Sequence, residues 1–248
     1  SALASLAISA TYGTAAPIVG VAVYAPLWLN QRVFGAIMVR SVGKDFPVDT
    51  SAGPAVSVFY HYTQAELLDG PGEGRKLFPA DKADALEAFV KTTCWEQKAE
   101  KLLPMGTYAD EYFDPTFAAS IARPALGAAG DCPPTDPVCI KWKARYSADR
   151  PHLVGAAATT PIFVAYGGKD TTIDPRFMRC ALDRLVDEAK ALTVCVDPEK
   201  DHGSIVSAEA DRVSDWIANV ALGGPAPKAC AHNAAAVAVD CFTPPPND

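Results

Sequence analysis

Three short apolar runs and several amphipathic stretches dominate the hydrophobic pattern of the chain. The runs at 18–26, 161–166 and 191–196 are continuous and rich in β-branched residues, which is typical of strands covered on both faces. Residues 175–190 and 207–222 instead repeat apolar positions at helical spacing. Because a strand, a helix and a second strand follow one another with short links, the pattern predicts neighbouring parallel strands joined by a right-handed crossover.

The remaining chain is predicted to be mainly helical. Residues 1–12 are rich in Ala and Leu and predict the last turns of a helix before the first strand. Within 30–158, helical patterns occur at 63–69, 79–101 and 113–123, separated by loops rich in Gly and Pro. We therefore expect the α/β class, with a mostly parallel sheet and a large, mainly helical insertion after its first strand.

Composition excludes several classes of protein. With 49% hydrophobic and 21% charged residues, the 248-residue chain is expected to be globular. Its net charge of −7 and the lack of a Lys/Arg cluster argue against nucleic-acid partners. No apolar run reaches the ~20 residues of a membrane span, so no transmembrane segment is expected. The spacing of Cys and His predicts no metal site, and we expect no cofactor.

Seven cysteines are many for a chain from a reducing compartment, so we expect disulfides and a secreted or periplasmic protein. One pairing follows from geometry, if a helix over 175–190 turns back into a strand over 191–196. Cys180 lies about 15 Å before the reversal at ~1.5 Å per residue, and Cys195 lies about 16 Å after it at ~3.3 Å per residue. The two sulfurs then meet at the same level, which predicts a Cys180–Cys195 disulfide.

The other cysteines suggest two local bridges and one thiol without a neighbour. Cys132 and Cys139 flank the proline-rich segment PPTDPV and predict a loop that closes on itself. Cys230 and Cys241 flank a C-terminal segment and predict a second closed loop. Cys94 is either a buried free thiol or bonded to a polypeptide outside this chain.

Two titratable residues follow the second and third predicted strands. Asp170 closes the loop after the second strand, where Gly167 and Gly168 are expected to let the backbone turn sharply, and His202 follows the third strand in the corresponding place. Functional groups of open α/β sheets collect at the carboxyl ends of the strands, so we expect the two side chains to meet there. An Asp followed by a His matches the second half of the Ser–Asp–His order. In that arrangement the carboxylate orients the imidazole, and the imidazole takes the proton of the nucleophile.

Each residue also has an ordinary structural interpretation. Asp170 alone is compatible with a turn cap and His202 alone with a loop histidine, but their order, spacing and strand context together favour catalysis. Asp174 is a rival acid, yet its place directly before Pro175 favours a helix cap. Ser1 as an N-terminal nucleophile is disfavoured, because it lies within a predicted helix and leaves the pair unexplained.

Nearby polar residues and the other histidines are given no catalytic role. Asp201 is expected to point away from His202 into solvent, and Ser204 is too close in sequence to face the imidazole productively. His61 and His152 lack an acid at a strand end and are expected to be structural.

The stretch from PIFVAYGGKDTTIDP to DHGSIVSAEADRVSDWI resembles the C-terminal half of an α/β-hydrolase, most closely the secretory lipase family of secreted serine esterases. The resemblance covers 161–222, and APIVGVAVYAPLWLN is similar to the strand after the nucleophile helix of that family. It implies that Asp170 is the triad acid and His202 the triad base. It further implies four parts: the end of the nucleophile helix with a core strand at 1–29, a helical cap at 30–158, the C-terminal α/β core at 159–222, and a disulfide-closed tail at 223–248.

The nucleophile elbow of that family, G-x-S-x-G, does not occur in these 248 residues. We expect the nucleophilic Ser on an N-terminal segment that is separated from this chain by proteolytic processing of one precursor. Cys94 is a candidate for a disulfide to that segment.

The sequence therefore predicts a secreted serine hydrolase that cleaves small-molecule or lipid esters of carboxylic acids through an acyl-enzyme. Two alternatives stay open. The same triad serves serine peptidases and acyltransferases, and a hydrolase-like chain without a working nucleophile would be a non-catalytic binding protein. Aromatic residues of the cap are candidates for an acyl-binding pocket, or else for its core: Phe59, Tyr60, Tyr62, Tyr112, Phe113 and Phe117.

Overall fold

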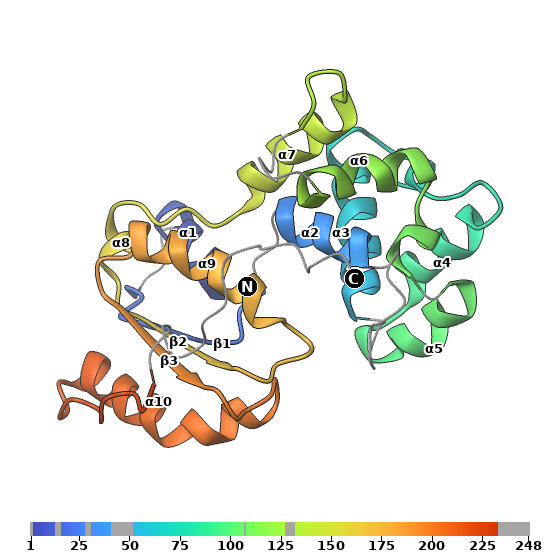
Figure 1. The fold of residues 1–248 in the computed structure, drawn as a ribbon. Coiled ribbons are helices and arrows are strands. Elements are labelled where there is room, and N and C mark those ends of the chain that lie inside the picture. The colour runs from blue at the N-terminus through green and yellow to red at the C-terminus, as the bar shows by residue number, and fades with distance from the viewer. Residues whose placement is uncertain are drawn as a thin grey trace. The chain divides into compact units, whose positions relative to one another are not determined.

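The computed structural model describes residues 2–12, 16–27, 31–40, 52–106, 108–126 and 132–232. These residues cluster into two compact units, coloured along the chain in Figure 1. The sheet unit consists of the described residues within 1–28 and 149–247, and the helical unit of those within 29–148. Within the described part of the chain, no helix is both long and apolar enough to cross a membrane.

Three parallel strands form the sheet of the sheet unit. They are β1 (Val21–Tyr24), β2 (Ile162–Gly167) and β3 (Leu192–Asp197), in the order β1-β2-β3. β1 falls within its predicted apolar run, and β2 and β3 each end one residue beyond theirs. β2 and β3 are parallel neighbours joined through a helix, as the pattern indicates. The α/β class is thereby confirmed.

The central strand β2 is buried on both faces, which explains its unbroken apolar sequence. Ile162, Val164 and Tyr166 pack on one face, while Phe163 and Ala165 pack on the other. Helices α1 (Ala2–Tyr12), α8 (Ala156–Thr159) and α9 (Pro175–Glu188) cover the first face, and α10 (Ser204–Leu222) covers the second (Figure 1). The sheet is therefore the middle layer of three.

Helices and short 3-10 turns make up the described part of the helical unit. Its α-helices are α2 (Gln31–Arg40), α3 (Ala52–Leu68), α4 (Ala83–Thr92), α5 (Lys98–Leu102), α6 (Pro115–Leu126) and α7 (Pro137–Asp149). Its 3-10 turns are η1 (Arg75–Leu77), η2 (Trp95–Gln97), η3 (Leu103–Met105) and η4 (Ala109–Tyr112). The predicted helical pattern at 79–101 is broken, because Thr93 and Cys94 adopt extended backbone between α4 and η2.

Aromatic side chains fill the core of the helical unit. Tyr62, Tyr112, Phe113 and Phe117 are buried there, each at most 5% exposed. These four residues therefore belong to the core of the unit, which is the second of the two interpretations given above. Phe59 and Tyr60, the other two candidates, are partly buried and pack against the same core.

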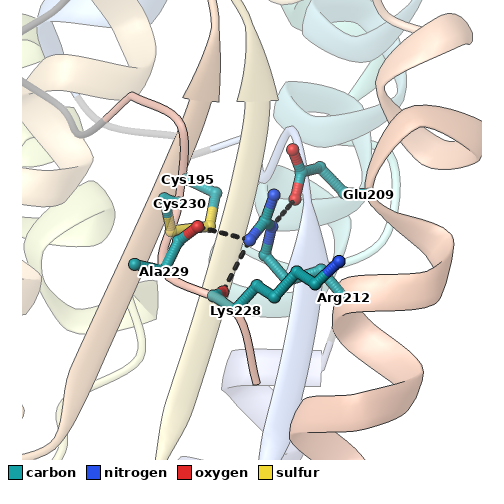
Figure 2. The surroundings of a disulfide bond; sticks show 6 residues. All are labelled: Cys195, Glu209, Arg212, Lys228, Ala229 and Cys230. Atoms are coloured by element: carbon teal, nitrogen blue, oxygen red, sulfur yellow. Dashed lines mark hydrogen bonds and ion pairs between the residues drawn. A yellow bond between two sulfur atoms is a disulfide. The ribbon is translucent and has the colours of Figure 1, made fainter.

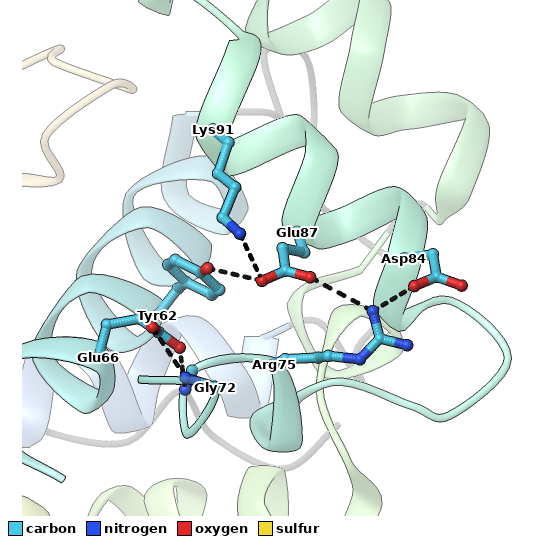
Figure 3. Close-up of polar contacts among 8 residues, drawn as sticks. Tyr62, Glu66, Gly72, Arg75, Asp84, Glu87 and Lys91 are labelled. Atoms are coloured by element: carbon cyan, nitrogen blue, oxygen red, sulfur yellow. Dashed lines mark hydrogen bonds and ion pairs between the residues drawn. The ribbon is translucent and has the colours of Figure 1, made fainter. Parts of the chain in front are cut away.

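Carboxylates hold the loop that follows α3. Glu66 accepts hydrogen bonds from the backbone N–H groups of Gly72 and Gly74, at 3.0 and 2.8 Å (Figure 3). Gly72 has a φ of +86°, which a glycine adopts without steric cost.

A second carboxylate network in the same figure joins α3, η1 and α4 through Tyr62, Arg75, Asp84, Glu87 and Lys91. Its hydrogen bonds, first from Lys91 and then from Tyr62, lower the pKa of Glu87 to about 2.

One predicted disulfide is confirmed. Cys132 and Cys139 are bonded, with their Cα atoms 5.6 Å apart, and close the loop before α7. Cys94 is unpaired within the described part of the chain and exposed, so the alternative of a buried free thiol is wrong. Its proposed bond to a separate polypeptide stays a prediction.

The other two predicted disulfides are wrong, because Cys195 is bonded to Cys230, with Cα atoms 5.2 Å apart (Figure 2). The C-terminal segment runs beside β3, so it brings Cys230 to a strand residue that the helix–strand geometry had assigned to Cys180. The side chain of Cys180 and the whole of Cys241 lie outside the described residues. The described part of the tail, residues 223–232, is thus tied to the sheet through Cys230.

Polar contacts reinforce this attachment of the C-terminal segment. The Arg212 guanidinium donates to the backbone carbonyls of Lys228 and Ala229, and its Nε donates to Glu209 at 2.6 Å (Figure 2). The N–H of Val196 in β3 donates to the carbonyl of His232 at 3.1 Å. These bonds and the disulfide together cover part of the edge of β3, which limits unwanted strand pairing there.

We expect the double variant Cys195→Ala/Cys230→Ala to lose between about 3 and 4 kcal/mol of unfolding free energy, because the bridge closes a loop with a sequence separation of 35. The matched control Cys132→Ala/Cys139→Ala should lose less, about 2.5 kcal/mol, since its separation is 7. Urea unfolding under non-reducing conditions measures both losses. A loss for the first pair no larger than that for the second would contradict the prediction.

Candidate active site

The predicted acid and base meet at the carboxyl edge of the sheet. Asp170 lies three residues after the end of β2, His202 follows β3, and His202 Nδ1 lies 2.8 Å from Asp170 Oδ2. The Asp170 side chain is fully buried, whereas 44% of the His202 side chain is exposed. The structure thus brings the two residues into a direct charge-assisted hydrogen bond.

Backbone amides fix the orientation of the Asp170 carboxylate. Its Oδ1 accepts hydrogen bonds from the N–H groups of Thr172 and Ile173, at 2.9 and 2.7 Å. Its Oδ2 is left to accept from His202. Because a carboxylate only accepts, the neutral imidazole carries its proton on Nδ1, and Nε2 keeps a free lone pair. Sequence reasoning did not identify these two amide donors.

The loops that carry the pair are joined by backbone hydrogen bonds. Gly168 N–H donates to the carbonyl of Asp197 at 2.8 Å, and Lys169 N–H donates to the carbonyl of Lys200 at 2.9 Å. The two loops are thereby bonded to each other beyond the last paired residues of the strands, Gly167 and Asp197. Lys169 and Glu199 add an exposed ion pair between the same loops.

Close approach of the two loops explains Gly167 and Gly168. A Cβ on Gly167 would lie 2.2 Å from the carbonyl oxygen of Lys200, and one on Gly168 would lie 2.7 Å from the Cα of Pro198. Neither contact is sterically allowed, and both involve backbone, which cannot swing aside. The glycines were expected to permit a sharp turn; the structure gives contact distance as the reason.

We expect Gly167→Ala to destabilise the sheet unit by about 2 kcal/mol or more, because the added methyl group must push the two loops apart. Gly203→Ala is a matched control in the same region, since its nearest neighbour, Asp201 Oδ1, would lie 3.9 Å from the new Cβ. Thermal unfolding of both variants measures the difference. Equal stability of the two variants would contradict the proposed packing of the loops.

Asp201 and Ser204 bond to each other beside His202. Asp201 Oδ1 accepts from the Ser204 hydroxyl at 2.7 Å and from the N–H groups of Gly203 and Ser204 at 3.1 and 2.8 Å. These bonds, with the Ser204 hydroxyl first, hold the pKa of the Asp201 carboxyl below its ordinary value. Asp201 is exposed, as expected, but its carboxylate also has these three hydrogen-bond partners, which were not predicted. The spacing D-x-x-S at 201–204 was a readable signal for a capping arrangement.

The remaining candidates have structural environments. The carbonyl of Asp174 accepts from Met178 N–H at 3.4 Å, which fits its predicted place at the start of α9. His61 is fully buried in the helical unit. His152 Nδ1 lies 3.6 Å from the Glu188 carboxylate. Ser1 lies outside the described residues.

Within the part of the chain that the structure describes, no group of three or more His, Cys, Asp or Glu side chains is placed to hold a metal ion.

Comparison with protein-family models, curated proteins and solved structures found no match to this chain. Its function is therefore inferred from the geometry of the site itself.

Proposed function

We propose that this chain supplies the acid and base of a secreted serine hydrolase that cleaves carboxylic esters through an acyl-enzyme. The observation that carries the proposal is the hydrogen bond between a buried, amide-bound Asp170 and a half-exposed His202 at the carboxyl edge of parallel strands. An α/β-hydrolase fold, with the helical unit as its cap, is the architecture that we propose on the same grounds.

The proposed mechanism uses the two nitrogens of His202 in different roles. Nε2 removes the proton from a serine hydroxyl as its oxygen attacks the ester carbonyl, and Nδ1–H stays bonded to Asp170, whose charge stabilises the imidazolium. The imidazolium then gives this proton to the departing alkoxide, which leaves as the alcohol, and the acyl group stays bonded to the serine oxygen. A water molecule then reacts in the same way. Nε2 takes a proton from the water, the water oxygen attacks the acyl group, and the serine oxygen leaves with that proton from the imidazolium.

We propose that the nucleophilic serine belongs to an N-terminal segment of the same precursor. No G-x-S-x-G occurs in the 248 residues, so an elbow of this type has to come from elsewhere. The exposed thiol of Cys94 is available for a disulfide to such a segment. The disulfides Cys132–Cys139 and Cys195–Cys230 agree with the proposed secretion.

A serine-reactive phosphonate probe tests this function on the protein isolated from its natural source. We expect covalent labelling of a serine on a polypeptide that co-purifies with this chain, and labelling at least about a hundredfold slower in a His202→Ala variant. An absence of labelling would contradict the proposal and favour a non-catalytic binding protein. Faster cleavage of amides than of matched esters would identify a peptidase instead.

A further inference from the structure

Backbone hydrogen bonds join the turn that carries His202 to the start of α10 at Ser204. Ile205 N–H donates to the carbonyl of Asp201 at 3.3 Å, which is the i to i+4 bond of an α-helix, and Val206 N–H donates to Gly203 at 3.2 Å. Asp201 and His202 therefore lie in a hydrogen-bonded turn that leads through the cap residue Gly203 into α10, which begins at Ser204. The imidazole is carried by a helix terminus and not by a free loop.

Asp201 and Ser204 bracket His202 reciprocally. The Asp201 carboxylate accepts from the amides of Gly203 and Ser204, while Asp201 N–H donates to the Ser204 hydroxyl at 2.9 Å. The same hydroxyl donates a hydrogen bond to the Asp201 carboxylate. This is a capping box built from Asp and Ser, and it closes a ring of hydrogen bonds around His202 and Gly203.

The helix behind this capping box rests on the strand that carries the acid. Ile205 and Trp216 of α10 are buried against Phe163 and Ala165 of β2, with the rings of Trp216 and Phe163 5.6 Å apart. Asp170 follows the end of β2. Strand β2 thus supports both partners, one through its own loop and the other through the first turn of α10.

We propose that Asp201 and Ser204 are positioning residues, which hold the backbone of His202 so that its Nδ1 stays within hydrogen-bond distance of Asp170. Within the described residues, the bond to Asp170 is the one hydrogen bond that the His202 side chain makes. Its side chain is half exposed, so little packing restrains it. The restraint must therefore come from its backbone, where the capping box acts. The catalytic consequence rests on the proposed function; the positioning itself does not.

Exchange of the His202 Nδ1 proton with solvent, followed by NMR in the full chain, measures the positioning. We expect Asp201→Ala and Ser204→Ala to speed this exchange about five- to tenfold, the factor that corresponds to a lost helix cap. Asp201→Asn keeps an oxygen acceptor for the two amides and should restore exchange to near the original rate. Ser207→Ala is the matched control, because its hydroxyl bonds to the Ser204 carbonyl and not to Asp201, and it should change nothing.

The hydrolase activity of the complete protein gives the second readout. If the proposed function holds, Asp201→Ala should lower kcat by about 10- to 100-fold with KM little changed, since the displaced imidazole binds no substrate group. Unchanged proton exchange in a folded Asp201→Ala variant would overturn the inference. Faster exchange in a protein without any esterase activity would support the positioning and count against the proposed function alone.

Discussion

Replacing Asp170 with Asn should lower kcat for ester hydrolysis by about 10,000-fold without unfolding the protein. The reason lies in the two amides that bind Asp170 Oδ1. Because N–H groups only donate, the amide oxygen of the Asn has to take the Oδ1 position, and its NH₂ group then faces His202. That group donates to Nδ1 and moves the imidazole proton to Nε2. An Nε2 that already holds a proton cannot accept one from the nucleophile.

Initial rates with a chromogenic ester, measured on the complete protein, test this expectation. Glu199→Gln is the matched control: it also replaces a carboxylate by an amide on the adjoining loop, but among the described residues the Glu199 carboxylate contacts Lys169 in an exposed ion pair and not His202. We expect the control to keep kcat within about a factor of two, because exposed ion pairs contribute little. An Asn variant as active as the control would remove Asp170 from the mechanism.

The second large effect is a loss of stability of the helical unit in mild acid. His61 is fully buried there, its Nδ1–H donates to the Ser57 carbonyl at 2.7 Å, and its Nε2 accepts from the Tyr146 hydroxyl at 2.6 Å. The rings around it are Phe34, Tyr60, Phe113, Phe117, Trp142 and Tyr146. The cation Arg145 lies over the ring of Trp142. No carboxylate is among the described contacts of the ring, so a charged imidazole has no anionic partner there.

Burial accordingly lowers the pKa of His61 to about 3, while an unfolded chain titrates near 6.5. Below pH 6.5 the imidazole of His61 binds a proton in the unfolded state but not in the folded state, so acid favours unfolding. The free energy of unfolding should therefore fall by about 1.4 kcal/mol for each pH unit between about 6 and 3. Above pH 7, His61 should not change the free energy of unfolding with pH.

Urea unfolding of the helical unit between pH 7 and 5 checks this slope, because most carboxylates titrate below that range. His61→Gln should remove this dependence of the free energy of unfolding on pH, whatever its effect on stability at pH 7. His152→Gln is the control, since His152 is half exposed and should leave the slope intact. If the Gln variant unfolds too readily, an NMR titration of the original protein decides: a His61 ring that gains its proton near pH 6.5 would contradict the prediction.

The sequence was informative wherever a local pattern decides the structure. The runs that became β1, β2 and β3 are apolar because the strands are covered by helices, and that requirement is visible in the residues themselves. Adjacent parallel strands end at the same edge of a sheet, so the sequence alone predicts that an acid after β2 and a base after β3 lie close together. The hydrogen bond between Asp170 and His202 has the form that this reasoning anticipates.

Features that depend on distant parts of the chain were not accessible in this way. The bond between Cys195 and Cys230 follows from the path of the C-terminal segment along β3, which no local pattern encodes. Gly167 is required by the carbonyl of Lys200, a contact between two loops. The start of α10 was expected at residue 207, because the helical spacing of apolar residues does not include the polar capping box that precedes it.

Nitrogen-15 NMR of the His202 ring at neutral pH examines the proposed acid–base pair without needing the nucleophile. We predict a protonated Nδ1 and an unprotonated Nε2 in the original chain, and the reverse in the Asp170→Asn variant. A proton on Nε2 in the original chain, or the same tautomer in both proteins, would contradict the role given to this pair.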